Sequence, residues 1–496
     1  MEKFASIFKR IWFFSAVSLL GYGAWLFFDY NGPIIKNDLF MGLLSGIILI
    51  SLLVISMRKK SVKNRWFNQV LSIIITYYIV VLMLNSVLFD FFQPLALYDE
   101  VIYLVMVGLA MLLGYILVQA IYSIFKGSMN KNDIIMILLL FAFVFQFQLM
   151  AIIQDDFEYQ HIANEPIHIF ESGEGGYDIF RIPTLLVMNK GSKLSNGELL
   201  ESDRIVVMAE ARRNGSLDHG DIDLVQKISH DGGKTWSDLM VIRRYEKGIG
   251  KIGNSTPIFD KKNGTIHLLH LAGSEPKDYK TYNMMSYDGG ETYTEATFVS
   301  EGIVGPGHGI MIEGTPYDGR LIAPGYYDGG SRSVYSDDQG KTWIVSESLP
   351  DGNEAEIAQK DEQLIMIVRT DVGVASKHDP LNKLYTLSED GGTTWSDLMI
   401  MEEIKEPICM SSIVEDNGRL YYSHPDDYYS RGQMTIAYSE YISMNKSEKM
   451  LIYQGPSGYS DLGVAEDHNL YLIFENGAIE YDERITFLKI LVDGGE

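Results

Sequence analysis

Four copies of one short pattern occur in the second half of the chain: SHDGGKTW from Ser229, SYDGGETY from Ser286, SDDQGKTW from Ser336 and SEDGGTTW from Ser388. Each fits Ser-x-Asp-x-Gly-x-Thr-Trp, except that Tyr293 replaces the last Trp of the second copy. The copies recur every 50 to 57 residues, and such a period is typical of small sheets arranged around an axis. Within each copy we expect the Asp to accept hydrogen bonds from backbone N–H groups, and the aromatic ring to pack under a hairpin. The pattern therefore predicts a β-propeller and assigns these residues to the fold rather than to catalysis.

The composition of the 496-residue chain changes abruptly near residue 154. Residues 1–153 hold 11 Lys/Arg and 7 Asp/Glu, whereas the remainder holds 30 Lys/Arg and 58 Asp/Glu. We therefore predict two unlike parts, a membrane region over residues 1–153 and an acidic β-propeller domain over residues 166–496. A polar tether at residues 154–165 joins them.

The membrane prediction rests on apolar runs that are each about as long as the ~20 residues a helix needs to cross a bilayer. These five runs are Ile11–Phe28, Leu39–Met57, Val70–Phe89, Val101–Phe125 and Ile134–Ile153. A cleaved signal peptide has one short apolar region, so it does not explain them. Basic residues precede the first run and lie in alternate loops, which places the N-terminus in the cytoplasm. We therefore expect a multi-pass cell-membrane protein, with the lipid bilayer as a partner and residues after 154 outside the cell. The runs contain no charged residue, so anchoring is favoured over transport.

Strand-like runs begin at Ile167 and are separated by Gly- and Asp-rich turns. Dividing the domain length by the repeat spacing gives about six units, within the usual range of 4 to 8 propeller blades. The last strand-like run, Arg484–Leu491, is expected to pair with the first one near Ile167 and so to remove exposed edges. The predicted fold is an all-β six-bladed β-propeller preceded by an α-helical transmembrane region of about five spans.

Several function classes are disfavoured by the sequence. The ten histidines and the single cysteine, Cys409, show no metal-ligand spacing, and one cysteine permits no intrachain disulfide. Gly-rich strand-to-helix motifs and basic stripes are also missing, which argues against a nucleotide cofactor and against nucleic-acid binding. Two of the four Asn-x-Ser/Thr sequons, at Asn214 and Asn254, fall in candidate site segments, where a glycan would block the entry of a ligand. We therefore infer a chain made without N-glycosylation, which favours a bacterial source. We predict no metal and no cofactor.

With Phe-Arg-Ile-Pro at 180–183 upstream of the four repeats, the chain resembles the sialidase (neuraminidase) family, whose repeats are called Asp boxes. The resemblance covers roughly residues 165 to 496. It implies an exo-α-sialidase that removes terminal sialic acids from glycoproteins, glycolipids and oligosaccharides, with retention through a tyrosyl-glycosyl intermediate.

Three arginines resemble the family's carboxylate-binding triad: Arg181 in FRIP, Arg369 in IMIVRTDVG and Arg431 in SRGQMTIAYS. A guanidinium suits this role because its planar fork binds a carboxylate through paired N–H bonds and stays charged at any working pH. An acidic domain would repel an anionic sugar, so local positive charge is needed to hold it.

The family's nucleophile and its base are matched by Tyr459 in GYSDL and Glu354 in GNEAEIAQ. A phenol has a pKa near 10, so an adjacent base is needed for attack at neutral pH. Sialic acid carries its carboxylate on the anomeric carbon, where a neutral Tyr avoids the like-charge repulsion that an ionised Asp or Glu would meet. Glu356 is the rival for Glu354, and the phase of the motif favours Glu354.

The segment AEARRNGSLDHGDIDLV resembles the family stretch that presents the general acid/base, which implies that role for Asp218 and a pocket-lining role for Arg212. A general acid calls for an accessible carboxylate whose pKa is shifted upward. Asp221 and Asp223 compete with Asp218, although IDLV reads as a strand, where a side chain points to a fixed face.

Two weaker matches in loops that resemble pocket-lining segments are Asn254 in GNSTPIFD and His308 in GPGHGI. Two other functions remain open from the sequence: transfer of the sugar to another hydroxyl, as trans-sialidases do, and sialoglycan binding by a propeller without catalysis. The candidate catalytic residues argue against the second, because a binding protein needs the arginines but not the nucleophile and its base.

Overall fold

The computed structural model describes residues 157–246, 249–327, 330–370, 382–405, 407–428 and 430–492, all within one compact unit. The five predicted spans and residues 154–156 of the predicted tether lie outside the described residues. Within these ranges, none of the helices has the length and apolar character needed to cross a membrane.

The described chain is built from β-strands, with short 3-10 helices at Glu174–Gly176 and Pro276–Asp278. An eight-stranded sheet contains β2 (Ile179–Met188), β3 (Arg204–Arg212), β4 (Ile222–Ser229), β5 (Met240–Arg243), β6 (Lys251–Asp260), β7 (Thr265–Gly273), β8 (Lys280–Ser286) and β9 (Thr297–Glu301). A six-stranded sheet contains β10 (Ile303–Val304), β11 (Ile310–Met311), β12 (Leu321–Tyr327), β13 (Gly330–Ser336), β14 (Ile344–Val345) and β15 (Leu349–Pro350). A four-stranded sheet contains β16 (Gly352–Lys360), β17 (Gln363–Thr370), β18 (Asn382–Ser388) and β19 (Met399–Lys405). A seven-stranded sheet contains β1 (Ile167–Glu171), β20 (Ser412–Asp416), β21 (Arg419–Pro425), β22 (Gly432–Ser439), β23 (Glu448–Val464), β24 (Leu470–Asn476) and β25 (Arg484–Ile490).

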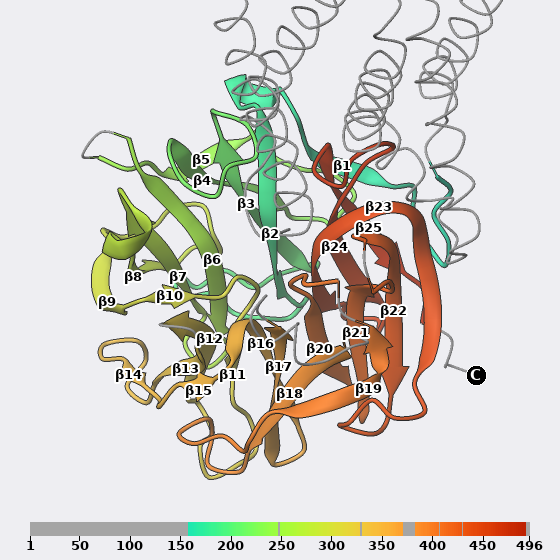
Figure 1. Ribbon diagram of the computed structural model, residues 1–496. Coiled ribbons are helices and arrows are strands. Elements are labelled where there is room, and N and C mark those ends of the chain that lie inside the picture. The colour runs from blue at the N-terminus through green and yellow to red at the C-terminus, as the bar shows by residue number, and fades with distance from the viewer. Residues whose placement is uncertain are drawn as a thin grey trace, which may run out of the picture. The chain divides into compact units, whose positions relative to one another are not determined.

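The sheets follow one another around the unit in chain order, as the colours from green through yellow and orange to red show (Figure 1). The 17-residue strand β23 pairs with β22 along its first part and with β24 along its second part. The chain's last strand, β25, pairs with its first, β1, with Ile167 opposite Phe487. The all-β class and this end-to-end pairing are therefore confirmed, whereas the number of six blades stays a prediction.

The first of the four repeated turns shows how each one is held. Asp231 accepts hydrogen bonds from the backbone N–H and the hydroxyl of Thr235, at 2.9 and 2.6 Å, and from the hydroxyl of Ser229 at 2.9 Å. The other three turns repeat these contacts around Asp288, Asp338 and Asp390. The aspartates of the repeats are thus used to fix turns, as the pattern predicted.

The repeated turns are joined to the hydrophobic core through their aromatic residues. Trp236 packs edge to face against Phe487 of β25, with ring centroids 5.1 Å apart. Nearby, Phe170 of β1 stacks on Phe180 of β2 at 5.0 Å. All three phenylalanines are buried, so the core ties the first strands of the domain to the last.

Several strands change register partway along their length, which is the signature of a β-bulge, and four of them do so beside candidate site residues. The shifts lie between Arg181 and Thr184 in β2, Gly253 and Thr256 in β6, Gly352 and Ala355 in β16, and Ser457 and Ser460 in β23. In two of them a residue other than glycine has positive φ, Ile182 at 57° and Asn254 at 45°. Bulges redirect side chains, and each of these four segments contains or adjoins a candidate site residue.

Candidate active site

The candidate nucleophile and base contact each other directly. The hydroxyl of Tyr459 donates a 2.6 Å hydrogen bond to Oε2 of Glu354, and Nη1 of Arg369 donates to the same hydroxyl at 2.6 Å. Arg369 also forms an ion pair with Glu354. Tyr459 is 5% exposed and Glu354 is 6% exposed, so the proton lies between two groups that are almost closed to water. Of the two rivals in GNEAEIAQ, it is Glu354 and not Glu356 that contacts the tyrosine.

Burial raises the pKa of Tyr459 well above its ordinary value, and the Glu354 carboxylate adds to this effect. The charges of Arg369 and Arg431 act in the opposite direction without outweighing it. The resting tyrosine is therefore a neutral phenol whose proton is already shared with a carboxylate.

The three predicted arginines meet around Tyr459. The guanidinium carbons of Arg181 and Arg431 lie 5.4 and 5.3 Å from the centroid of its ring, while Arg369 donates to its hydroxyl. Nη2 of Arg431 also donates to the carbonyl of Ile408 at 2.9 Å, which orients this guanidinium. Guanidinium groups gathered beside one phenol form a site that can bind a carboxylate close to a nucleophile.

Asp218 and Arg212 belong to a second group of charged side chains, beside the group of three arginines around Tyr459. Nη2 of Arg212 pairs with Oδ1 of Asp218 and with Oε2 of Glu210, both at 2.8 Å, and Lys251 pairs with Glu210 at 2.8 Å. The Arg212 side chain is 1% exposed, whereas that of Asp218 is 75% exposed. A fixed buried cation thus holds a carboxylate that a large substrate can reach.

The expected upward shift of the Asp218 pKa is not found. Partial desolvation raises this pKa, but Arg212, Arg181 and Lys251 lower it further, to about 2. The prediction was wrong on this point because the sequence did not show how many cations surround this carboxylate. Because Arg181 is one of these cations, the charge of the arginine group around Tyr459 acts on Asp218.

Asp221 and Asp223, the two alternatives to Asp218, pair with other residues. Asp223 of β4 is 2% exposed and accepts hydrogen bonds from Tyr177 and Arg213, both at 2.5 Å. Asp221 pairs with Arg213 at 3.4 Å. Both carboxylates therefore belong to a neighbouring ion-pair group, which leaves Asp218 as the candidate beside Arg212.

The two weaker candidates have different surroundings. Asn254 is buried on β6, where its N–H donates to Glu210 at 3.1 Å and its side-chain amide donates to the carbonyl of Val304 at 3.3 Å. Asn254 therefore adjoins the Arg212 group. Nδ1 of His308 lies 2.8 Å from Glu356 and 2.8 Å from Asp461. Its substrate-binding role stays a prediction, since these contacts are to buried carboxylates, each two residues beyond Glu354 or Tyr459.

The family model for the BNR repeat-like domain matches residues 203–472, more than half of the chain. The chain belongs to this family. Among curated proteins it is similar to a sialidase of Micromonospora viridifaciens, 27% identical over 349 residues, or 62% of this chain and 51% of that protein. A sialidase of Clostridium perfringens is 24% identical over 398 residues, or 66% of this chain and 94% of that protein. Among solved structures, Hadza microbial sialidase Hz136 has a TM-score of 0.55 and 20% identity over 66% of this chain and 68% of its own.

By these matches, the BNR-repeat chain is similar to sialidases in sequence and in fold. It spans about half the length of the Micromonospora protein and nearly all of the Clostridium protein. The all-β sialidase-like fold predicted from the repeats is confirmed.

Two residues that contact the candidate site residues were not predicted from the sequence. Glu475 of β24 accepts hydrogen bonds from Nε and Nη2 of Arg181, at 2.8 and 3.1 Å, and from the backbone N–H groups of Ile182 and Tyr459. It therefore holds Arg181 and the strand that carries Tyr459 together. An acidic residue directly after the apolar run LYLIF, in the same strand-like segment, was a usable signal, because an unpaired buried carboxylate is costly.

Tyr481 is the second missed residue. Its ring centroid lies 5.1 Å from the guanidinium carbons of both Arg181 and Arg431, so these arginines are flanked by two tyrosines. Nothing in the sequence distinguishes it among 30 tyrosines.

Proposed function

We propose that this chain is an exo-α-sialidase, a glycoside hydrolase that removes terminal sialic acids from glycoproteins, glycolipids and oligosaccharides with retention of configuration. The observation that carries the proposal is the hydrogen bond from Tyr459 to Glu354 inside a group of three arginines. The curated relatives, which are sialidases, support the reaction class.

In the first step, the arginines hold the substrate carboxylate and so place the anomeric carbon above the Tyr459 hydroxyl. The phenolic oxygen forms a bond to that carbon as its proton passes to Glu354. The glycosidic bond breaks, and Asp218 gives a proton to the leaving oxygen. The sugar is then bound covalently to Tyr459.

In the second step, Asp218 takes a proton from water, whose oxygen attacks the anomeric carbon from the face that the leaving group vacated. The bond to Tyr459 breaks, and Glu354 returns its proton to the phenolic oxygen. Two inversions at one carbon give net retention.

The nucleophile in this scheme is a neutral phenol, whereas in most retaining glycosidases a carboxylate attacks. A carboxylate nucleophile would approach the carboxylate that sialic acid carries on its anomeric carbon, and the two negative charges would repel. The neutral state of Tyr459 in the resting site fits this requirement, since burial keeps the phenol protonated until Glu354 accepts the proton.

The low pKa of Asp218 is compatible with a role as acid only if substrate binding raises it. Arg181 is one of the cations that lower this pKa, and it is also an arginine of the carboxylate-binding group. A bound substrate carboxylate would cancel part of that positive charge and make protonation of Asp218 easier. Substrate binding would thereby prepare its own general acid.

The proposal is tested by following the anomer released from a sialoside by nuclear magnetic resonance. We expect the α-anomer first, and a β-anomer appearing first would contradict retention. Tyr459→Phe, which keeps the ring and removes the reacting oxygen, should lose nearly all turnover. Equal turnover by this variant and the parent protein would remove the nucleophile assignment.

Product analysis with an added acceptor sugar separates hydrolysis from transfer, because a trans-sialidase would form a new sialoside. A binding protein without catalysis would retain the sialoside and release nothing.

The proposal also includes a location, in which residues 1–153 anchor the protein in the cell membrane and the catalytic domain lies outside the cell. Its support is the five apolar runs and the distribution of basic residues between them. Protease treatment of intact cells should remove a C-terminal tag. A tag that is cleaved only after the cells are opened would place the domain inside.

A further inference from the structure

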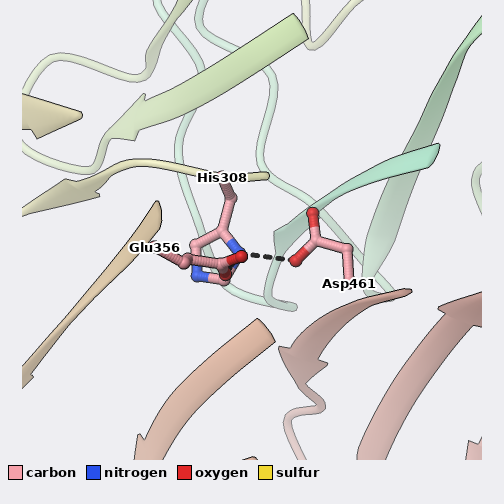
Figure 2. Close-up of side chains that lie close together, drawn as sticks. All are labelled: His308, Glu356 and Asp461. Carbon is pink, nitrogen blue, oxygen red and sulfur yellow. Dashed lines mark hydrogen bonds and ion pairs between the residues drawn. The ribbon is translucent and has the colours of Figure 1, made fainter. Parts of the chain in front are cut away.

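A second set of interacting side chains lies beside Tyr459 and Glu354, which we refer to as the catalytic pair, and takes no part in the steps above. His308, Glu356 and Asp461 point toward one another (Figure 2), with Nδ1 of His308 at 2.8 Å from an oxygen of each carboxylate. The hydroxyl of Ser412 lies 2.8 Å from Oε1 of Glu356 and 3.0 Å from Oδ1 of Asp461. We refer to these four residues as the buried cluster. Glu356, Asp461 and Ser412 are fully buried, and the His308 side chain is 12% exposed.

The buried cluster uses the same two strands as the catalytic pair. Glu356 is two residues beyond Glu354 on β16, and Asp461 is two residues beyond Tyr459 on β23. β16 and β23 belong to different sheets, so no ladder of backbone hydrogen bonds sets the distance between them. The distance between nucleophile and base therefore depends on side chains that bridge the two strands.

The buried cluster provides such a bridge and extends it to other strands. His308, from the segment before β11, contacts both carboxylates, and Ser412, the first residue of β20, contacts both as well. The other oxygen of Asp461 accepts the backbone N–H of Leu185 in β2 at 2.7 Å. Segments from all four sheets are thus joined at one point.

We propose that His308, Glu356 and Asp461 are positioning residues, which hold β16 and β23 at the separation that the hydrogen bond between Tyr459 and Glu354 requires. This inference rests on the proposed function, because it takes Tyr459 and Glu354 as nucleophile and base. Attack needs the reacting atoms aligned closely, and a misplacement of about 1 Å can cost about 100-fold in rate.

The charges of the buried cluster explain why it holds the strands firmly. Two carboxylates facing each other away from water would repel, and the histidine and the serine hydroxyl between them replace that repulsion by hydrogen bonds. Three of these residues, His308, Glu356 and Asp461, are the one group, within the described part of the chain, whose ligand atoms could surround a metal ion. We infer that hydrogen bonds rather than a metal ion join these side chains, since the contacts of 2.8 Å are hydrogen-bond distances between the side chains themselves.

The test compares His308→Gln with His267→Gln in the full chain. His267 is a buried histidine, 1% exposed, which packs beside Trp343 and lies on β7, a strand that carries none of the candidate site residues. Turnover, KM, the melting temperature and the affinity for an unreactive sialic acid analogue would be measured for each. Ser412→Ala, which removes one hydroxyl from the buried cluster, is a milder second variant if His308→Gln fails to fold.

We expect His308→Gln to lower kcat about 10- to 100-fold per folded molecule, with the affinity for the analogue unchanged within about twofold. Ser412→Ala should act in the same direction by a smaller factor, and His267→Gln should leave kcat per folded molecule unchanged. A normal kcat in both buried-cluster variants, or an equal loss in His267→Gln, would overturn the proposal. So would a stoichiometric metal ion in the purified protein, measured by elemental analysis.

These results remain distinct from failure of the proposed function. If Tyr459→Phe is inactive while the buried-cluster variants keep normal kcat, only the positioning role is lost. If Tyr459→Phe keeps its activity, the nucleophile assignment fails first.

Discussion

Tyr459 donates its hydroxyl hydrogen to Glu354 over 2.6 Å, although the two residues are 105 positions apart and lie in different sheets. Each is found in a strand segment where the register shifts, Glu354 between Gly352 and Ala355 and Tyr459 between Ser457 and Ser460. The shifts free these side chains from the regular alternation of their strands. The contact between these two candidate catalytic residues is therefore made where the ladders of their strands are interrupted.

Glu354→Gln tests the role of the base. The amide keeps the size of the side chain but cannot take the phenolic proton, so we expect kcat to fall by about 10² to 10⁴. The three arginines keep their charge, so KM should change much less. Steady-state kinetics measures both values.

Glu362→Gln is the matched control, because Glu362 is exposed in the turn between β16 and β17. It should keep the kinetics of the parent protein. A Glu354→Gln variant that does the same would show that another group accepts the proton.

Arg181→Lys tests carboxylate recognition. Lysine keeps the positive charge but loses the paired N–H geometry and the two bonds to Glu475, so kcat/KM should fall about 10- to 100-fold. The comparison is made with a sialoside and with its methyl ester, which carries no charge at that position.

The variant and the parent protein should differ much less on the ester than on the acid. An equal loss on both substrates would mean that Arg181 acts through the fold, by way of Glu475, and not through the substrate carboxylate.

The sequence predicted this arrangement where a motif carried the information. The four repeats gave the all-β fold, and FRIP, GYSDL and GNEAEIAQ led to Arg181, Tyr459 and Glu354, which the structure brings together. In each case the residue type follows from local chemistry, such as a turn that needs Asp or a phenol that needs a base.

What the sequence did not show depends on contacts between distant strands. Glu475 stands 294 residues from Arg181, and no spacing rule connects them. The low pKa of Asp218 results from cations on several strands, whereas the loop sequence alone suggested an exposed and easily protonated acid. The surroundings of His308 also come from strands 48 and 153 residues away, which no local pattern encodes.

Asp218→Asn tests the general acid through the leaving group. An amide gives no proton to a departing sugar oxygen, so cleavage of a natural sialoside should slow by about 10² to 10⁴. An aryl sialoside with a good leaving group needs no such proton, and its first step should be nearly unaffected. A burst measurement of the released phenol separates this step from the later attack by water.

For Asp218→Asn the same loss of rate on both substrates in the first step would contradict the assignment. Asp221→Asn is the control, since Asp221 pairs with Arg213 outside the arginine group.

The buried cluster should make the protein less stable as pH rises. Burial raises the pKa of Glu356 to about 8, although the charge of His308 beside it acts in the opposite direction. Glu356 therefore binds its proton more tightly in the folded state than in the unfolded state. The free energy of unfolding is highest below the unfolded pKa of Glu356 and is lost as pH rises through the folded pKa, by up to about 1.4 kcal/mol per pH unit for this proton.

Tyr459 and Glu354 are also ionisable and lie two residues from Asp461 and Glu356 on the same strands. The change of stability with pH is therefore assigned to Glu356 by comparing the parent protein with Glu356→Gln. The amide resembles the protonated acid and cannot ionise. Melting temperatures measured from pH 5 to pH 9 should fall less steeply for this variant than for the parent protein, and the two curves should separate most toward pH 8. Parallel curves would show that Glu356 does not change its charge in this range. The proton of the buried cluster would then be assigned to His308 alone.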